Sequence, residues 1–408
     1  MKKIGVIGLN YFPEISSTGL YTTEMCEYLS KHFEVKVITG YPYYPEWKIK
    51  EEYNNKNEIL EEIVNNVKIT RVKQYVPSKV NVFNRLFHYW DFYRKALSVS
   101  KKENFDMVMV ILPNIFLLNL AIKLKKRSPE MKIWVHVQDF EIDAGLEMMK
   151  NIGRIKIIKN SLHFIEKTLF SKFDVVSTIS EGMIMKFDSR GASKEKQFLL
   201  PNWADVDFIY PIPKSPYREE LGIKDNEFVV MYSGNIGKKE DWDILIDTIK
   251  KISHEDEIKF VIAGDGNKKE YVHNALKNFK NTILLPLQPK SRLNDFLNLA
   301  DLHILPQKKN EVDSFMPSKV LGIKATGRPL LCLANKNSSV YLEIYKNDLG
   351  YVLDENNYDR CIEKIIEIRS CKLREEKGKK ARKHVIENYK YENVMKNLEK
   401  KIHNLLLL

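Results

Sequence analysis

Short apolar runs alternate with helix-period segments through the first half of the chain. The apolar runs have the length and the β-branched composition of buried strands, and they predict strands at residues 4–9, 35–39, 67–72, 107–112, 132–137 and 175–179. The segments between them predict helices at residues 18–32, 84–102, 115–126, 155–173 and 181–190. Strands that alternate with helices predict a parallel sheet covered on both faces, with ligands at the carboxyl ends of the strands.

A second alternating series follows a stretch with four prolines at residues 201–216. Its predicted strands are residues 228–232, 259–263, 282–285, 302–305 and 330–333. The whole pattern predicts an α/β protein with two doubly wound, Rossmann-like domains that face a cleft. We expect a first domain at residues 1–203, a linker at 204–216 and a second domain at 217–385. The helical segment 386–408 is expected to cross back to the first domain.

The charge of the chain limits the classes of partner, and its cysteines indicate the redox compartment. The net charge is +12 over 408 residues, and residues 1–200 carry 31 Lys and Arg against 23 Asp and Glu. Such an excess suits nucleic acid, anionic lipid or phosphorylated small molecules. The chain has no metal-binding Cys/His spacing and no aromatic RNA-binding signature, so we expect no nucleic-acid partner. Four scattered cysteines indicate free thiols in a reducing compartment, and no apolar run is long enough to span a membrane. We therefore expect a cytoplasmic protein.

The stretch 313–329 carries the clearest candidate site. It follows a predicted buried strand, opens a helix near Pro317 and Ser318, and ends that helix at Gly327. The free N–H groups of a helix start at the carboxyl end of a strand bind anions, and Lys319 adds a positive charge. We predict that a diphosphate binds here.

Two further loops have the composition of phosphate sites. Residues 10–19 follow the first strand and end on capping residues and Gly19, although an ordinary strand–helix turn explains them as well. Residues 232–240 contain Gly234, Gly237 and Lys239 after another strand. Neither the P-loop spacing nor the Gly-x-Gly-x-x-Gly pattern occurs there, which argues against ATPase and NAD-binding functions.

Acidic residues raise the question of catalysis and metal binding. Asp139 follows the strand at 132–137, where a carboxylate can orient an acceptor hydroxyl or stabilise a positively polarised sugar carbon. Helix capping is the alternative for this residue, and we favour the catalytic role. The triplets at 205–207 and 241–243 lie in the linker and at a helix start, so we predict no metal site.

The helix at 84–102 interleaves aromatic and basic side chains. Arg85, Trp90, Arg94 and Lys95 on one helix suit contact with an anionic membrane surface or with an acceptor held there. A core helix with solvated cations is an equally good explanation of this helix alone. With the charge excess of the first half, peripheral membrane contact becomes our hypothesis.

Several motifs together resemble bacterial glycosyltransferases of family 4, which have the GT-B fold. The resemblance covers most of the chain and is closest to a colanic acid and capsular polysaccharide branch of fucosyl- or fucosaminyltransferases. It rests on Asn10-Tyr-Phe-Pro-Glu14, Gly19-Leu-Tyr-Thr22, Thr39-Gly-Tyr-Pro-Tyr-Tyr-Pro45, His136-Val-Gln-Asp139-Phe-Glu-Ile-Asp143, Tyr232-Ser-Gly-Asn-Ile-Gly237, Met316-Pro-Ser-Lys319 and Gly327-Arg-Pro329.

The resemblance implies sugar transfer from a UDP- or GDP-sugar to a lipid-linked (polyprenyl-diphosphate) saccharide, in capsule, exopolysaccharide or O-antigen synthesis. Retention of anomeric configuration, independence of metals and the absence of a cofactor are implied as well, as is a place on the inner face of the cell membrane. The implied base contact is Leu287. The implied donor contacts are Gly19, Gly234, Asn235, Lys239, Phe315, Met316, Pro317, Ser318 and Lys319.

The chain departs from the family at one position. Many relatives place a ribose-binding Glu five residues before the helix-ending glycine, and here that residue is Gly322. Two other functions remain open at this point: a nucleotide-sugar 2-epimerase of the same fold and a non-catalytic scaffold for glycan assembly.

Overall fold

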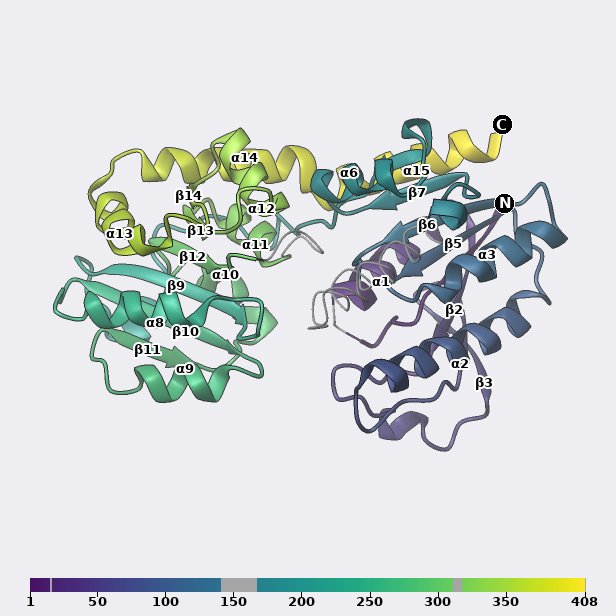
Figure 1. The fold of residues 1–408 in the computed structure, drawn as a ribbon, viewed down its shortest axis with the longest axis horizontal. Helices are drawn as coiled ribbons and strands as arrows, with labels where there is room; N and C mark the ends of the chain where they lie inside the picture. The colour runs from purple at the N-terminus through teal and green to yellow at the C-terminus, as the bar shows by residue number, and fades with distance from the viewer. Residues whose placement is uncertain (15–16, 141–166, 311–317, 408) are drawn as a thin grey trace, which may run out of the picture. The chain divides into compact units, whose positions relative to one another are not determined.

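The computed structural model describes residues 1–14, 17–140, 167–310 and 318–407. The chain divides into two compact units. The first unit contains Met1–Asn202 and Met395–Leu408, and the second contains Trp203–Val394. Each unit is an α/β fold around one sheet (Figure 1).

The first unit has an eight-stranded sheet in the order β3-β4-β2-β1-β5-β6-β7-β8. All neighbours are parallel except β3 and β4. The strands are β1 (Lys3–Ile7), β2 (Glu34–Gly40), β3 (Ile59–Val64), β4 (Val67–Val72), β5 (Met107–Leu112), β6 (Lys132–Val137), β7 (Val175–Thr178) and β8 (Gln197–Leu199). The helices are α1 (Ser17–Leu29), α2 (Val82–Ser100), α3 (Phe116–Arg127) and α6 (Glu181–Ser189), with short 3-10 turns at Glu51–Tyr53 and Lys194–Lys196.

All six predicted strands of this unit are confirmed, whereas β3 and β8 were missed. β3 is an edge strand in which Ile59, Glu61 and Ile63 are exposed, so it lacks the apolar run of a buried strand. The predicted helix at 155–173 lies largely outside the described residues.

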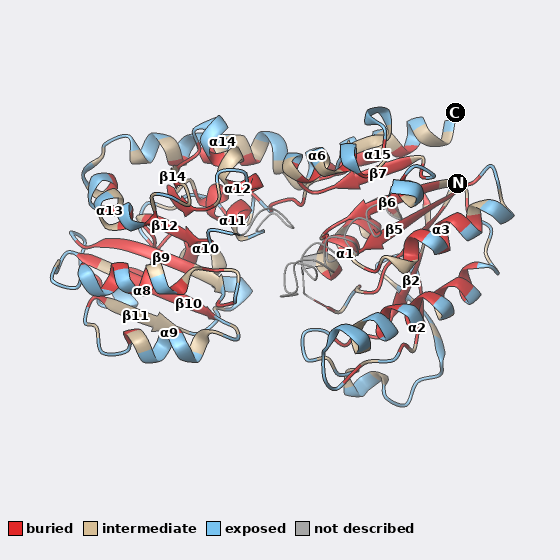
Figure 2. Cartoon of the chain, viewed as in Figure 1, coloured by how far each residue is buried: buried red, intermediate tan, exposed pale blue. Residues whose placement is uncertain are grey.

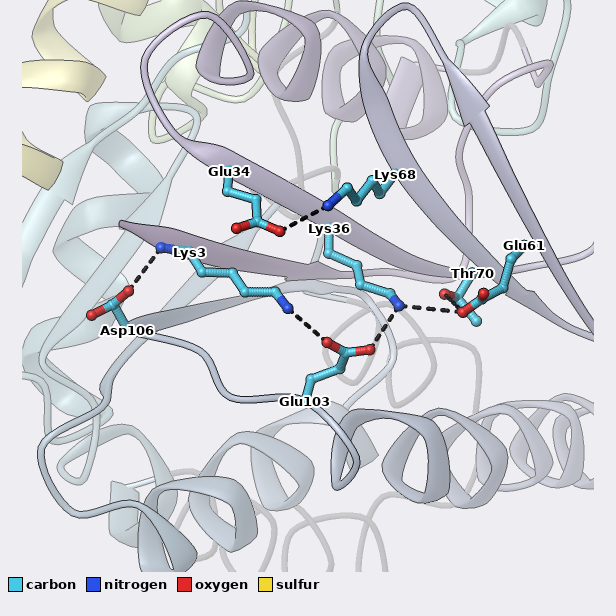
Figure 3. Close-up of polar contacts among 8 residues, drawn as sticks. All are labelled: Lys3, Glu34, Lys36, Glu61, Lys68, Thr70, Glu103 and Asp106. Carbon is cyan, nitrogen blue, oxygen red and sulfur yellow. Dashed lines mark hydrogen bonds and ion pairs between the residues drawn. The ribbon is translucent and has the colours of Figure 1, made fainter. Parts of the chain in front are cut away.

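Ion pairs connect the start of the sheet to the loop before β5. Figure 3 shows Glu103 between two lysines, with its oxygens 2.8 Å from Lys3 Nζ and 2.7 Å from Lys36 Nζ. Lys36 also contacts the more exposed Glu61 at 3.3 Å. Burial alone would raise the pKa of Glu103, but the hydrogen bonds from both lysines outweigh it and hold that pKa below its usual value. The network therefore fixes the loop on the sheet at neutral pH.

The second unit has a fully parallel six-stranded sheet in the order β11-β10-β9-β12-β13-β14. The strands are β9 (Phe228–Asn235), β10 (Ile258–Asp265), β11 (Thr282–Leu285), β12 (Leu302–Pro306), β13 (Leu330–Leu333) and β14 (Tyr351–Leu353). The helices are α7 (Tyr217–Glu220), α8 (Trp242–Lys251), α9 (Lys269–Leu276), α10 (Leu293–Leu297), α11 (Lys319–Thr326), α12 (Ser339–Asn347), α13 (Cys361–Ser370) and α14 (Arg374–Tyr389), with 3-10 turns at Lys290–Arg292 and Tyr358–Arg360. Because strand order reverses between β9 and β12, this order is the doubly wound one, with its ligand position at that reversal.

Two apolar cores cover the two faces of this sheet. Alternate residues of β9 point to opposite faces: Val230 packs with the α8 and α13 side, and Val229 and Met231 pack with the α10 and α11 side. Figure 2 shows β9, β10 and β12 as mainly buried, whereas the edge strand β11 is intermediate. Because both faces of these strands are buried, the strands appear in the sequence as continuous apolar runs.

The segment expected to be a linker belongs to the second unit. Ala204, Val206 and Ile209 are buried in its core, and Arg382 of α14 donates to the carbonyl oxygens of Val206 and Ile209. The C-terminal crossing also differs from the expected start at residue 386. Helix α15 (Tyr391–Leu407) begins in the second unit, and the chain joins the first unit from Met395.

Candidate functional site

The carboxyl ends of β9 and β12 form the centre of the candidate site. β9 continues through Gly234 to Asn235 and pairs there with Gly264 and Asp265 of β10. Gly234 and Gly264 have φ of +132° and +146°, values that side chains disfavour. A Cβ on Gly264 would lie 1.8 Å from the Gly234 carbonyl oxygen. Both glycines are therefore required for the close approach of these two strand ends.

Lys319 is in the first turn of α11 and lies against the end of β9. Its Nζ donates hydrogen bonds to Tyr232 Oη at 2.8 Å and to Glu240 Oε1 at 3.0 Å, and it lies 4.3 Å from the centre of the Tyr232 ring. A Cβ on Gly234 would be 3.4 Å from Lys319 Nζ, so the glycine leaves room for the ammonium group. Burial lowers the pKa of Lys319, and the Glu240 carboxylate opposes that shift.

Tyr232 and Glu240 were not predicted as site residues. The Tyr232 hydroxyl donates to the Asn235 carbonyl oxygen at 2.6 Å, and burial together with Glu240 raises the pKa of Tyr232, so the hydroxyl stays protonated. The signal was present in the sequence, because Tyr232 opens the glycine loop and Glu240 closes it. Their joint contact with Lys319 depends on the tertiary structure.

The other predicted donor contacts of this unit lie around the same edge. Asn235 ends β9, and the Lys239 carbonyl oxygen accepts from Lys308 N just after β12. Ser318 precedes α11 and is exposed, and Gly327 ends that helix in the left-handed conformation, as predicted. Phe315, Met316 and Pro317 lie outside the described residues.

A small pocket adjoins the ends of β10 and β11. It has a volume of about 200 Å³, and Gly264, Leu285 and Pro286 are among the residues that line it. Leu287, the predicted base contact, follows this wall and is 70% exposed. Leu285 and Pro286, which precede Leu287 in the chain, line the pocket.

The predicted donor-binding and catalytic residues of the first unit, Gly19 and Asp139, lie in a helix and after a strand. Gly19 lies inside α1, where its carbonyl oxygen accepts from Thr23 Oγ1 at 2.8 Å. Asp139 is half-buried two residues after β6. In the loop after β1, the buried Glu14 carboxylate accepts hydrogen bonds from the backbone N–H groups of Tyr43 and Tyr44 and ties two loops together. Burial raises the pKa of Glu14.

His136 is a buried structural residue near Asp139. Its Nδ1 lies 2.9 Å from Ser177 Oγ, and its Nε2 lies 2.9 Å from the side-chain amide of Gln138. Burial lowers the pKa of His136 to about 3, so the imidazole is neutral at physiological pH. Glu141 and Asp143 lie outside the described residues.

Exposed apolar side chains lie along the amino-terminal half of helix α2 and just before it. We call this surface the α2 patch; its residues are Val80, Val82, Phe83, Leu86, Phe87 and Trp90. Arg94 lies over the Trp90 ring at 5.4 Å and is mainly exposed. All three predicted cations have partners within the unit: Arg94 and Lys95 pair with Asp91 at 3.7 and 3.2 Å, and Arg85 donates to Tyr89 Oη.

Two negative findings concern the described residues alone. They contain no group of three or more His, Cys, Asp or Glu side chains placed to hold a metal ion. No helix among them is long and apolar enough to cross a membrane. The Asp-x-Asp triplets have local roles: Asp241 caps α8, and Asp207 pairs with Lys390 at 3.1 Å.

The chain has two doubly wound units, one of which carries a lysine at a helix start over a glycine loop, and this architecture agrees with the GT-B fold. Comparisons with known proteins identify the same class. Residues 213–385 match the family described as glycosyl transferases group 1. The chain is 30% identical over 335 residues to the "Putative colanic acid biosynthesis glycosyl transferase WcaI" of Escherichia coli K12, covering 80% of this chain and 81% of that protein. The chain therefore belongs to the group 1 glycosyltransferases and is a glycosyltransferase.

Further comparisons extend the likeness over nearly the whole chain. The chain is 20% identical to the "N-acetyl-alpha-D-glucosaminyl L-malate synthase" of Bacillus anthracis, over 96% of this chain and 95% of that protein. Among solved structures, the sucrose-phosphate synthase of Thermosynechococcus elongatus has a TM-score of 0.77 at 12% identity and covers both chains fully. Anabaena HepE in complex with UDP and glucose has a TM-score of 0.69 at 12% identity, covering 99% of this chain and 100% of that one. At these identities the solved structures support the fold.

Proposed function

We propose that the protein transfers a sugar from a UDP- or GDP-sugar to a lipid-linked saccharide during synthesis of a surface polysaccharide. The transfer retains anomeric configuration and needs neither a metal ion nor a cofactor. The observation that carries the donor half of this proposal is the Lys319 ammonium group, held at the end of β9 beside Gly234. A fixed cation beside a glycine loop suits a diphosphate.

The hydrogen-bond count at Lys319 leaves room for a phosphate. An ammonium group has three N–H donors, and described residues accept from it at Tyr232 and Glu240. The third donor can bind a diphosphate oxygen. Ser318, Asn235 and Lys239 lie in the adjoining segments, and the pocket at Leu285 and Pro286, which is partly apolar, offers a site for the base.

Names of relatives support the polysaccharide half of the proposal. WcaI is named for colanic acid biosynthesis, and a Salmonella typhimurium relative, 24% identical over 343 residues, is named "Lipopolysaccharide 1,2-N-acetylglucosaminetransferase". HepE was crystallised with UDP and glucose, which agrees with a nucleotide-sugar donor. In this proposal Asp139 is the catalytic carboxylate and Gly19 provides a backbone contact to the donor.

The α2 patch supports an acceptor held in a membrane. Six exposed apolar side chains, with Arg94 stacked on Trp90 at their edge, have the composition of a surface that binds an anionic membrane interface. We propose that this patch places the protein on the inner face of the cell membrane. The test is flotation with anionic and with neutral vesicles at low salt. Recovery with anionic vesicles, lost in Phe83→Ser/Trp90→Ser, supports it, and recovery that is equal for the variant contradicts it.

A donor screen tests the proposed reaction. Purified protein is incubated with UDP- and GDP-sugars, with and without a polyprenyl-diphosphate saccharide, and release of UDP or GDP is measured. Release that increases with the lipid acceptor is expected. Conversion of the donor to its epimer without acceptor, or no release from any donor, would contradict the proposal.

A further inference from the structure

Glu240 is held at the point where the strand order of the second sheet reverses. Its backbone pairs with Gln307 just after β12, and the next residue, Asp241, donates its N–H to the Pro306 carbonyl oxygen at 2.7 Å. The side chain is 10% exposed. Glu240 is therefore a buried carboxylate on a fixed backbone, between the ends of β9 and β12.

The two oxygens of this carboxylate differ in their partners. Oε1 accepts a hydrogen bond from Lys319 Nζ at 3.0 Å. Oε2 is buried and accepts no hydrogen bond from any residue that the structure describes. It lies beside the glycine loop, since a Cβ on Gly237 would be 3.4 Å away. A buried carboxylate oxygen without a donor is costly, and native proteins seldom keep one without a function.

The chemistry of the free oxygen limits what can bind it. A diphosphate at neutral pH has acceptor oxygens and would repel a carboxylate, so the phosphate groups themselves cannot satisfy Oε2. A hydroxyl group can, because an O–H bound to a carboxylate forms a strong hydrogen bond. Nucleotide sugars carry hydroxyls on both sides of the diphosphate, on the ribose and on the sugar. Lys319 neutralises Glu240, which allows a diphosphate to bind nearby.

Helix α11 does not supply a carboxylate for this purpose at Gly322. A Cβ at that position would lie 3.4 Å from Leu297 Cδ1 and 3.6 Å from Ile209 Cδ1. We propose that Glu240 is the carboxylate that recognises the donor, with its Oε2 accepting a hydrogen bond from a hydroxyl of the nucleotide sugar. This inference rests on the proposed nucleotide-sugar donor.

The test compares three sizes of probe on the wild type and on Glu240→Gln. Glutamine can keep an oxygen on Lys319 while placing an N–H₂ donor where Oε2 was. The probes are inorganic pyrophosphate, UDP or GDP, and UDP-glucose or GDP-mannose, with affinities measured by calorimetry. We expect Glu240→Gln to bind the nucleotide sugar about tenfold more weakly or worse, and pyrophosphate at least as tightly as the wild type.

The pattern of loss distinguishes the two hydroxyl sources. If Glu240→Gln already binds UDP or GDP more weakly than the wild type, the hydroxyl belongs to the ribose. In that case the wild type should bind either the 2′-deoxy or the 3′-deoxy nucleotide similarly weakly, and the weaker of the two identifies the hydroxyl. A loss confined to the nucleotide sugar identifies the transferred sugar. Equal affinities in both proteins, or an equal loss with pyrophosphate, would overturn the inference and leave the proposed function intact. A wild type that binds no nucleotide or nucleotide sugar would overturn the proposed function itself.

A matched control guards against general damage to the unit. Glu343→Gln breaks a comparable buried pair, in which Glu343 contacts Lys324 of the same helix α11 at 2.6 Å. We expect its ligand affinities to equal those of the wild type. If Glu240→Gln does not fold, Glu240→Asp keeps the charge, shortens the reach to the hydroxyl and is compared with the same probes.

Discussion

Replacing Lys319 tests the centre of the candidate site. Lys319→Met keeps an apolar stem against Tyr232 and Gly234 but removes the ammonium group. If the third N–H of Lys319 binds the diphosphate, the variant loses one charge-assisted hydrogen bond, worth about 1.5–3 kcal/mol. At 1.4 kcal/mol per factor of ten, this loss weakens donor binding roughly 10- to 150-fold.

The same change has a second consequence, which must be separated from the first. Glu240 would remain buried without its cation, and breaking a buried pair in this way costs about 3–5 kcal/mol of folding stability. Lys324→Met is the control, because Lys324 is also buried, lies on α11 and pairs with Glu343. We expect both variants to lose stability and only Lys319→Met to lose affinity.

Calorimetry with UDP and GDP measures the nucleotide affinity, under conditions where both variants are folded. Unfolding followed by circular dichroism measures the loss of stability. We expect the dissociation constant of Lys319→Met to exceed that of Lys324→Met roughly 10- to 150-fold. Binding of the nucleotide by Lys319→Met within twofold of the wild type would refute this expectation. An equal loss in Lys324→Met would instead show that α11 as a whole had moved.

Three further predictions follow from other parts of the structure. Glu103→Gln should cost about 1–2 kcal/mol at pH 7, because two lysines donate to a carboxylate that is 18% exposed, whereas Glu61→Gln, at 72% exposed, should cost little. Since the pKa of Glu103 is lowered in the folded state, its contribution is present above the unfolded pKa of about 4.3 and disappears as pH falls through the folded value, which urea unfolding at several pH values will show. Gly264→Ala should cost at least about 1–3 kcal/mol and weaken UDP or GDP binding, because its φ is +146° and its Cβ would overlap the Gly234 carbonyl; Gly222→Ala, with φ of +66° and open space around it, should leave nucleotide binding unchanged. Asp139→Asn should lower kcat with little change in donor KM, and wild-type turnover in that variant would end the catalytic assignment.

The fold followed closely from the sequence because its signals are local. Apolar runs such as 107–112 and 302–305 gave β5 and β12 near their observed bounds, and Gly327 ended α11 in the conformation that its position required. The prediction failed where burial is one-sided. β3 alternates exposed and half-buried residues at a sheet edge. The proline-rich stretch at 204–216 contains apolar residues that pack into a core of the second unit, although its sequence has no helix or strand periodicity.

The candidate site was predictable in part. Lys319 could be proposed from the sequence because its position at a helix start after a strand is a local feature. Tyr232 and Glu240 were missed as its partners because they lie 87 and 79 residues away in the chain, and no local pattern relates a lysine to residues so distant. Their contact exists because β9 and β12 are neighbours in the sheet, which brings the loops at their carboxyl ends together.

The sequence by itself therefore determined the two parallel sheets, the family and the positive charge at a helix start, since periodicity, caps and glycine positions are properties of neighbouring residues. The tertiary structure alone decided which groups share that charge. Strand order brought the Tyr232 phenol of β9 and the Glu240 carboxylate that follows this strand to the ammonium group of Lys319. Packing left one oxygen of Glu240 without a partner among the described residues.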